Sequence, residues 1–229
     1  MFKGIYKLIF FTFVAFSELS AAADLSSFSN QQTITAFKDA LQQSATNAVA
    51  LLGQQGGFLN NPQVRIPLPG PLAQGEKVLR MVGMGKQADQ LEVAMNQAAE
   101  AAVPLATSLI TTVIKQMSVS DAKGILMGGD DSATRYFQSK TEGTLYGKFL
   151  PIVTKKMKEV NLAQQYSALA GKVDSMGLLK SNNLKLENYV TQKALDGLYL
   201  TMAEQEKSFR QNPMQAGTNL AKRLFESLR

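Results

Sequence analysis

Cysteine, tryptophan and histidine are absent from this chain of 229 residues. The lack of cysteine excludes disulfides, thiolate nucleophiles and cysteine metal ligands, and the lack of histidine excludes histidine-based metal sites and Ser-His-Asp catalysis. Any catalysis would have to use carboxylates, Lys, Arg, Tyr, Ser or Thr. Because no spaced loop of acidic ligands is present either, we predict neither a metal site nor a cofactor.

The remaining composition is that of a globular protein. Hydrophobic residues make up 45% of the chain, so we expect little disorder, and the length suffices for one sizeable domain. The formal net charge is +6, with basic residues spread out except at Lys155, Lys156 and Lys158. We interpret this group as a solvated helix face, with contact to anionic lipid or a polyanion as the alternative. No stacking aromatic residues accompany these lysines, so we expect no nucleic-acid binding.

The first 23 residues have the pattern of a cleavable export signal. Two lysines precede an apolar run over residues 8–16, and small residues follow at positions 20–23. A membrane anchor or a buried core helix is the alternative, but the run has about ten residues, whereas a bilayer span needs roughly 20. We expect cleavage near Ala22 and Ala23, a flexible lead-in over residues 24–31, and a periplasmic protein with no transmembrane span after signal removal. Without cysteine it is not a lipoprotein.

Apolar residues recur at helical spacing through most of residues 32–229, which we predict to form a single all-α domain. No pair of alternating strands joined by a hairpin turn is present. We predict helices over residues 34–52, 72–84, 86–116, 118–127, 132–148, 152–160, 162–173 and 184–209, and a last helix after Asn212-Pro213.

Proline and glycine predict where this helical pattern breaks. Residues 53–71 combine turn signals with alternating apolar residues and prolines, and proline cannot supply the N–H that a central strand needs. We interpret this Pro/Gly-rich segment as an irregular connector across the core, with a recognition segment for a proline-binding partner as the alternative. Pro104 should kink or divide its helix. Pro151, preceded by Gly143 and Gly147, should end another.

A double-glycine corner, Gly128-Gly129, separates two of the predicted helices. Ser118 and Asp121 have the spacing of a capping box at the start of the first helix. We expect Asp130 or Asp131 to cap the second. The amides of a helix start can also hold an anion, but the aspartates already place negative charge there, so we favour a structural cap over a ligand site.

Several motifs together resemble a family of exported, helical bacterial proteins, the domain of unknown function 4197. They are Ile66-Pro67-Leu68-Pro69, Gly128-Gly129-Asp130 with Ala133-Thr134 and Tyr136-Phe137, Phe149-Leu150-Pro151-Ile152-Val153, Tyr189-Val190 with Ala194-Leu195-Asp196-Gly197-Leu198, and Glu206 and Arg210 before Asn212-Pro213. The resemblance covers residues 32–228. It implies a single all-α domain behind a signal peptide or lipoprotein signal, and it brings no activity, substrate or catalytic residue. The chain departs from the family pattern at Ser132, where we expect a smaller residue, usually Ala.

Polar residues of these motifs form our candidate functional or structural cluster. Its members are Asp130, Thr134, Arg135, Tyr136, Asp196, Glu206 and Arg210. Asp196 lies in an apolar helix, where a buried carboxylate would need a cationic partner such as Arg135 or Arg210. We favour an internal salt-bridge network that fixes helix packing. A carboxylate pair for acid–base chemistry, or for a hard cation, is the alternative.

Three functions remain open. We favour a non-enzymatic binding or interaction module, whose partner is a hydrophobic small molecule, a peptide or an envelope protein. The second is a carboxylate-dependent hydrolase using Asp130, Asp196 or Glu206, which requires these carboxylates to meet in an open cleft. The third is a peripheral envelope protein that binds membranes through basic helices and exposed apolar surface. We assign no catalytic residue.

Overall fold

The computed structural model describes residues 30–159, 161–175, 185–212, 218–219 and 222–223, and these contain helices and no strand. The elements are α2 (Asn30–Gly53), α3 (Gly70–Met81), α4 (Gly85–Ala102), the 3-10 turn η1 (Val103–Leu105), α5 (Ala106–Gln116), α6 (Val119–Leu126), α7 (Ser132–Glu159), α8 (Leu162–Asp174) and α9 (Leu186–Gln211). The all-α prediction is confirmed. The predicted signal peptide, most of the lead-in and most of the last helix lie outside the described residues.

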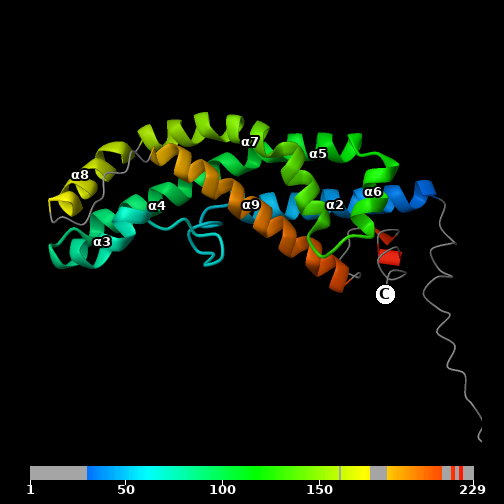
Figure 1. The fold of residues 1–229 in the computed structure, drawn as a ribbon, viewed down its shortest axis with the longest axis horizontal. Helices are drawn as coiled ribbons and strands as arrows, with labels where there is room; N and C mark the ends of the chain where they lie inside the picture. The colour runs from blue at the N-terminus through cyan, green and yellow to red at the C-terminus, as the bar shows by residue number, and fades with distance from the viewer. Residues whose placement is uncertain (1–29, 160, 176–184, 213–217, 220–221, 224–229) are drawn as a thin grey trace, which may run out of the picture.

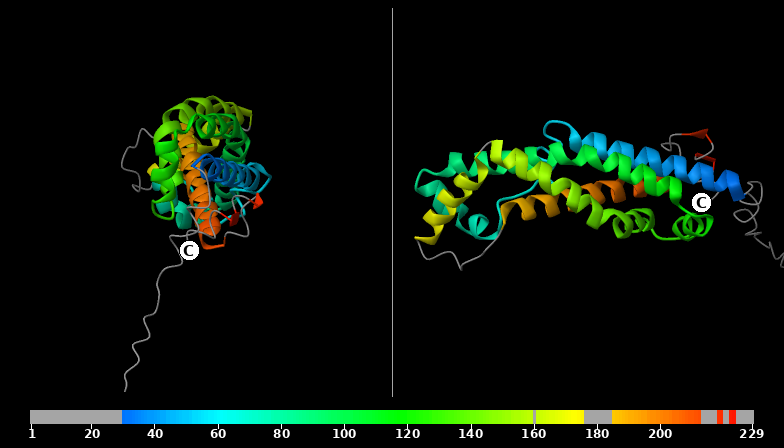
Figure 2. Two further views of the ribbon diagram at one scale, coloured as in Figure 1. Left: turned by 90° about the vertical axis from the view of Figure 1, so that its right-hand side faces the viewer. Right: turned by 90° about the horizontal axis from the view of Figure 1, so that it is seen from above.

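The helices form an elongated body (Figures 1 and 2). Its middle is built from α4, α7 and α9, which pack against one another. One end holds α2, α5 and α6, and the other holds α3 packed on α8. One continuous hydrophobic core runs through the molecule and includes residues from both ends, such as Phe37 on α2 and Leu169 on α8. This arrangement brings the late helix α9 beside the corner between α6 and α7.

Pro104 divides the long helix predicted over residues 86–116. The chain passes from α4 through η1 into α5 at this proline, as expected for a residue that lacks the amide hydrogen. The combined stretch Gly85–Gln116 is, among the described residues, the one helical stretch long and apolar enough to cross a membrane. Its residues Leu91, Met95 and Ile110 are fully buried in the core, and core helices share this length and composition.

The predicted helix break at Pro151 is wrong, because α7 continues through this proline. Buried side chains recur at every fourth position of α7 on both sides of it. They are Phe137, Thr141, Leu145, Phe149, Val153 and Met157. Pro151 itself is exposed, so its ring and its missing amide hydrogen face away from this buried stripe. Packing thus outweighs the local cost of proline, and α7 is visibly bent in Figure 1.

Candidate functional site

Glu206 and Arg210 on α9 form a buried ion pair at the corner between α6 and α7. Arg210 Nη2 lies 2.8 Å from Glu206 Oε1, and the two side chains are 13% and 6% exposed, respectively. The residues are one helical turn apart on α9, so both reach the same neighbours. We call this pair the corner clamp.

Glu206 caps the start of α7. Its Oε1 accepts a hydrogen bond from the amide of Ala133 at 3.0 Å, and its Oε2 accepts from the amide and the hydroxyl of Thr134, each at 3.0 Å. These amides belong to the first turn of a helix, where they have no partner within the helix, and where a negative charge is favoured by the helix dipole. A residue 72 positions away in sequence therefore performs the capping.

The prediction that Asp130 or Asp131 caps α7 is therefore not what the structure shows. Asp130 is exposed, and the Asp131 carboxylate instead pairs with Arg135 at 2.8 Å, with both side chains about half exposed or more. The amides of Ala133 and Thr134 at the start of α7 donate to Glu206, because α9 brings this buried carboxylate close to them. Water does not compete for the oxygens of a buried carboxylate, whereas it does compete for those of an exposed aspartate.

Arg210 binds the end of α6. It donates to the carbonyl of Ile125 at 3.0 Å and to the carbonyl of Leu126 at 3.3 Å. The last carbonyls of a helix lack partners within the helix and favour a positive charge. The corner clamp thus holds the end of one helix and the start of the next with two opposite charges.

Ser132 and Gly128 complete the corner. The Ser132 hydroxyl donates to the carbonyl of Ile125 at 2.7 Å and accepts from Arg210 Nη2 at 2.9 Å. A Cβ atom on Gly128 would lie 2.6 Å from the Ser132 Cβ, so this position requires glycine, whereas a Cβ atom on Gly129 would make only an ordinary contact with Arg135 Nη2 at 3.7 Å. The Ser132 hydroxyl therefore gives the corner clamp a hydrogen bond that alanine cannot make.

The other members of the predicted cluster lie outside the corner clamp. The Tyr136 hydroxyl donates to Asp121 Oδ2 at 3.3 Å. Hydrogen bonds from Ser118 hold the pKa of Asp121 below its usual value, and burial raises the pKa of Tyr136. These contacts confirm the capping box of α6, in which the Asp121 amide donates to Ser118 Oγ at 3.0 Å.

Asp196 is exposed and pairs with Lys193 at 3.1 Å. A partner for a buried Asp196, for which Arg135 and Arg210 were candidates, is therefore not needed, because the neighbouring Gly197 faces the core instead. Of the seven candidates, Thr134, Glu206 and Arg210 come together. The carboxylates that a hydrolase would need do not converge. Within the described ranges, no group of three or more acidic side chains could hold a metal ion.

Two polar residues of α4 were missed by sequence reasoning. Asn96 Oδ1 accepts from the amide of Ile66 at 2.9 Å, and Asn96 Nδ2 donates to the carbonyl of the same residue at 2.9 Å. Glu100 Oε1 accepts from the amides of Phe58 and Leu59 at 3.1 and 3.3 Å. Both side chains are buried. They hold the irregular segment, residues 54–69, against α4, and we call them the segment lock.

The irregular segment also packs on α9. A Cβ atom on Gly197 would lie 2.6 Å from Phe58 Cε1, so the absence of a side chain lets the fully buried Phe58 approach α9. The Tyr189 hydroxyl donates to the carbonyl of Pro67 at 3.0 Å. The segment is thus a structured connector across the core. The signal that could have found the segment lock is an Asn and a Glu, one turn apart, inside an apolar helical stripe.

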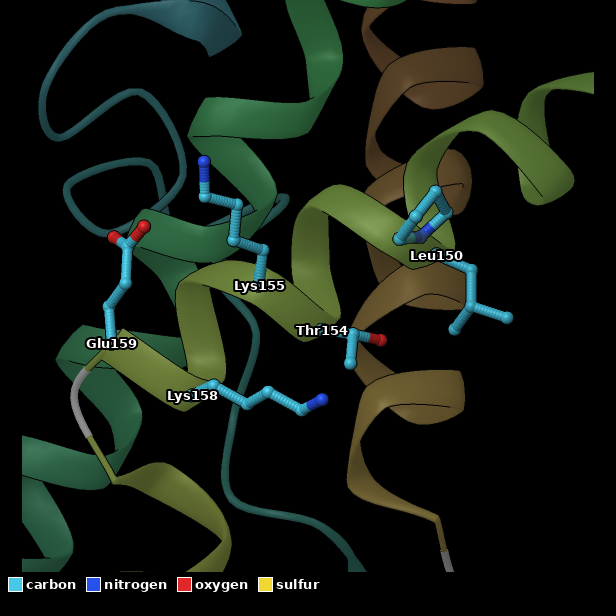
Figure 3. Close-up of a pocket in the computed structure, with 6 residues that line it drawn as sticks. Leu150, Thr154, Lys155, Lys158 and Glu159 are labelled. Atoms are coloured by element: carbon cyan, nitrogen blue, oxygen red, sulfur yellow. The ribbon is translucent and has the colours of Figure 1, made fainter.

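Three open hollows of about 660, 480 and 660 Å³ lie beside α7. The first shares Thr154 and Lys158 with the second and Pro151 with the third, whereas the second and third share no residue. The first is lined by Leu150, Pro151, Thr154, Lys155, Lys158 and Glu159 of α7 (Figure 3). The second continues toward the start of α8, and the third lies between α7 and residues 104–108 of η1 and α5.

Comparison with known proteins gives one finding. A family model described as a protein of unknown function (DUF4197) matches residues 27–226. This range includes the corner clamp, the segment lock and the three hollows beside α7, and it confirms the resemblance inferred from the motifs. No curated protein and no solved structure matches the chain.

Proposed function

The chain belongs to the DUF4197 family, and on that basis we propose that it is an exported binding or interaction protein that does no catalysis. The observation that carries this proposal is the use of Glu206. Both of its oxygens accept hydrogen bonds from the start of α7, and one also faces Arg210. This carboxylate has a complete structural role.

General acid–base chemistry supports the same conclusion. A catalytic carboxylate must reach the proton of a substrate through an oxygen that is accessible to it. Glu206 is 5% exposed, and protonating it would weaken its attraction to Arg210 and to the amides of α7. The other carboxylates proposed for a hydrolase, Asp130 and Asp196, are exposed and lie outside the corner clamp.

An interaction role fits the shape and the expected location of the protein. Helices run along the outside of the elongated body and expose extended faces (Figure 2). Such faces suit contact with another macromolecule. The export pattern of residues 1–23 supports a periplasmic location. In this proposal, the corner clamp and the segment lock keep the helices in register, and the outer faces bind the partner.

Native mass spectrometry of the mature protein, purified from its own periplasm at low salt, tests the proposal. We expect a species heavier than the monomer that contains a second molecule. A bare monomer, both in this measurement and after chemical cross-linking in intact cells, would contradict a binding role. So would reproducible turnover of any substrate that is lost in Asp130→Ala while the helical circular dichroism spectrum is unchanged.

A further inference from the structure

Methionine carries all the sulfur of this protein. The chain has 10 methionines and no cysteine. The periplasm, the location proposed above, is an oxidising compartment, and the methionine thioethers have no thiol in the same chain to compete with them for an oxidant. The methionines that react first are then those whose side chains are most exposed to solvent.

Two of the seven methionines that the structure describes differ sharply from the others in exposure. Met81 is 77% exposed and Met127 is 79% exposed. Met84, three residues after Met81, is partly buried and packs against the core. The remaining four are at most 5% exposed, and they are Met95, Met117, Met157 and Met202. Among the described methionines, an oxidant in solution therefore meets Met81 and Met127 first.

Helix geometry explains this exposure. Met81 is the last residue of α3, and Met127 directly follows α6. Each lies two residues after a buried side chain, which is Leu79 in α3 and Ile125 in α6. Because two residues correspond to about 200° of helical rotation, each methionine faces solvent when its buried neighbour faces the core. The two methionines lie at opposite ends of the elongated body, where Figure 1 places α3 and α6.

The backbone at both methionines is fixed by hydrogen bonds. After Met81, the amide of Val82 donates to the carbonyl of Val78 at 3.0 Å, and the amide of Met127 donates to the carbonyl of Lys123 at 3.1 Å. The turn after Met81 continues through Gly83, which has a φ of 79° and no heavy atom within 4 Å of the position of its missing Cβ. Each methionine thus projects from ordered backbone at a helix end, where an enzyme can reach it.

We propose that Met81 and Met127 are reversible oxidation sites of the folded protein. The oxidant is a hypohalous acid such as hypochlorous acid, and a methionine sulfoxide reductase restores the thioether. In the oxidation, the sulfur gives up two electrons and gains an S–O bond, the O–Cl bond breaks, and chloride and a proton are released. In the reduction, two electrons and two protons from a dithiol convert the sulfoxide oxygen into water.

The positions of the two methionines decide what oxidation does to the protein. A sulfoxide at Met81 or Met127 replaces an apolar group that already lies in water, so no core contact is lost. A sulfoxide at Met95, which is fully buried, would place a polar oxygen in the core and disrupt its packing. The protein can therefore consume oxidant at both ends of its body while its helices stay packed.

Titration of the folded mature protein with hypochlorous acid, followed by peptide mass spectrometry, tests the proposal. We expect Met81 and Met127 to become sulfoxides at least about tenfold faster than Met95 and Met202, with an unchanged helical circular dichroism spectrum. The same titration in urea should remove the difference, because the unfolded chain exposes every methionine. Equal rates in the folded protein, or a loss of helical signal as Met81 and Met127 react, would overturn the proposal.

A matched variant and a reductase complete the test. Leu79→Met places a thioether on the buried side of α3, a swap that conserves volume, and it should react as slowly as Met95 while Met81 reacts as before. If both positions of α3 react equally, burial does not select the site. Reductases for both sulfoxide epimers, with dithiothreitol, should restore Met81 and Met127 in the folded protein. Reduction in tryptic peptides but not in the folded protein would refute reversibility.

Discussion

The corner clamp and the segment lock solve the same problem by different chemistry. In each, two polar side chains one turn apart on a central helix bind backbone that is distant in sequence and would otherwise lack partners. The corner clamp uses opposite charges, with Glu206 at a helix start and Arg210 at a helix end. The segment lock uses a neutral amide, Asn96, and a carboxylate, Glu100, that no described cation approaches within ion-pair distance.

This difference predicts how much stability a single substitution should cost in each region. At the corner, each charge is compensated by the other and by a helix dipole, so removing one leaves the other buried without its counter-ion. In the irregular segment, support is shared between α4 and α9, because Gly197 and Tyr189 contact it as well as the segment lock. We therefore expect single substitutions at the corner to cost more than single substitutions in the irregular segment.

Replacing Arg210 should give the largest loss of stability. In Arg210→Met, Glu206 remains buried without its cation and the carbonyls of Ile125 and Leu126 lose their donor, so we expect about 3–5 kcal/mol less unfolding free energy in urea. Arg135→Met is the matched control at the same corner, because it breaks an exposed pair with Asp131 and should cost about 0–1 kcal/mol. Equal losses in the two variants would refute a special role for the corner clamp.

Replacing Asn96 tests the segment lock. In Asn96→Leu, the buried N–H and C=O groups of Ile66 lose their partners, which should cost about 1–3 kcal/mol. Hydrogen exchange should show lost protection of the Ile66 amide while α7 and α9 stay protected. Gln97→Leu, at an exposed position on the same helix, serves as the control. Uniform loss of protection throughout the protein would mean that the segment is not an independent unit.

Filling the space at Gly197 tests the contribution of α9 to the same segment. The new Cβ of Gly197→Ala would meet the fully buried Phe58, and such overpacking costs about 1–2 kcal/mol. Gly171→Ala on α8 provides the opposite control, because open space surrounds its Cβ position and alanine favours helix by about 0.5–1 kcal/mol. Thermal unfolding of both variants would reveal the difference in sign, and a stabilised Gly197→Ala would contradict the close approach of Phe58.

Local patterns predicted much of the fold. The capping box of α6 was readable because Ser118 and Asp121 lie three residues apart, and the division at Pro104 followed from its missing amide hydrogen. The cap on α7 was not readable, because Glu206 lies 72 residues from Thr134 and two nearer aspartates suggested a local solution. The approach of α9 decides which carboxylate reaches the helix.

The break in α7 was predicted from Pro151 and the glycines at 143 and 147, but a four-residue repeat of buried side chains runs through these positions. A strict repeat of four moves the buried stripe around an α-helix by about 40° at each step, so the apolar residues do not stay on one face. The stripe winds because α7 packs against several helices, which are α4, α5, α6, α8 and α9. A search for apolar residues on one fixed face of a helix does not detect a helix whose buried stripe winds. The lysines at 155, 156 and 158 were interpreted as a solvated helix face, and all three are exposed, with Lys156 paired to Glu159.

The smallest predicted effect concerns the local cap at the other end of α6. Ser118→Ala removes the acceptor for the Asp121 amide and should cost about 1 kcal/mol of unfolding free energy, less than the loss in Arg210→Met at the opposite end of this helix. The two variants compare the exposed, local cap that Ser118 provides at the start of α6 with the buried contact that Arg210 of α9 provides at its end. A loss in Ser118→Ala as large as that in Arg210→Met would show that burial does not decide the cost.

The pH dependence of this local cap gives a second measurement. Hydrogen bonds from Ser118 hold the pKa of Asp121 below its ordinary value of 3.8 in the folded protein. A lowered folded pKa means that the stabilisation is complete above the unfolded pKa and is lost as the pH falls through the folded pKa. Unfolding titrations should therefore show the protein losing stability below about pH 4, with a shallower loss in Ser118→Ala, because Asp121 then lacks the donors that lower its pKa. Identical acid profiles for the two proteins would assign the acid sensitivity to other carboxylates.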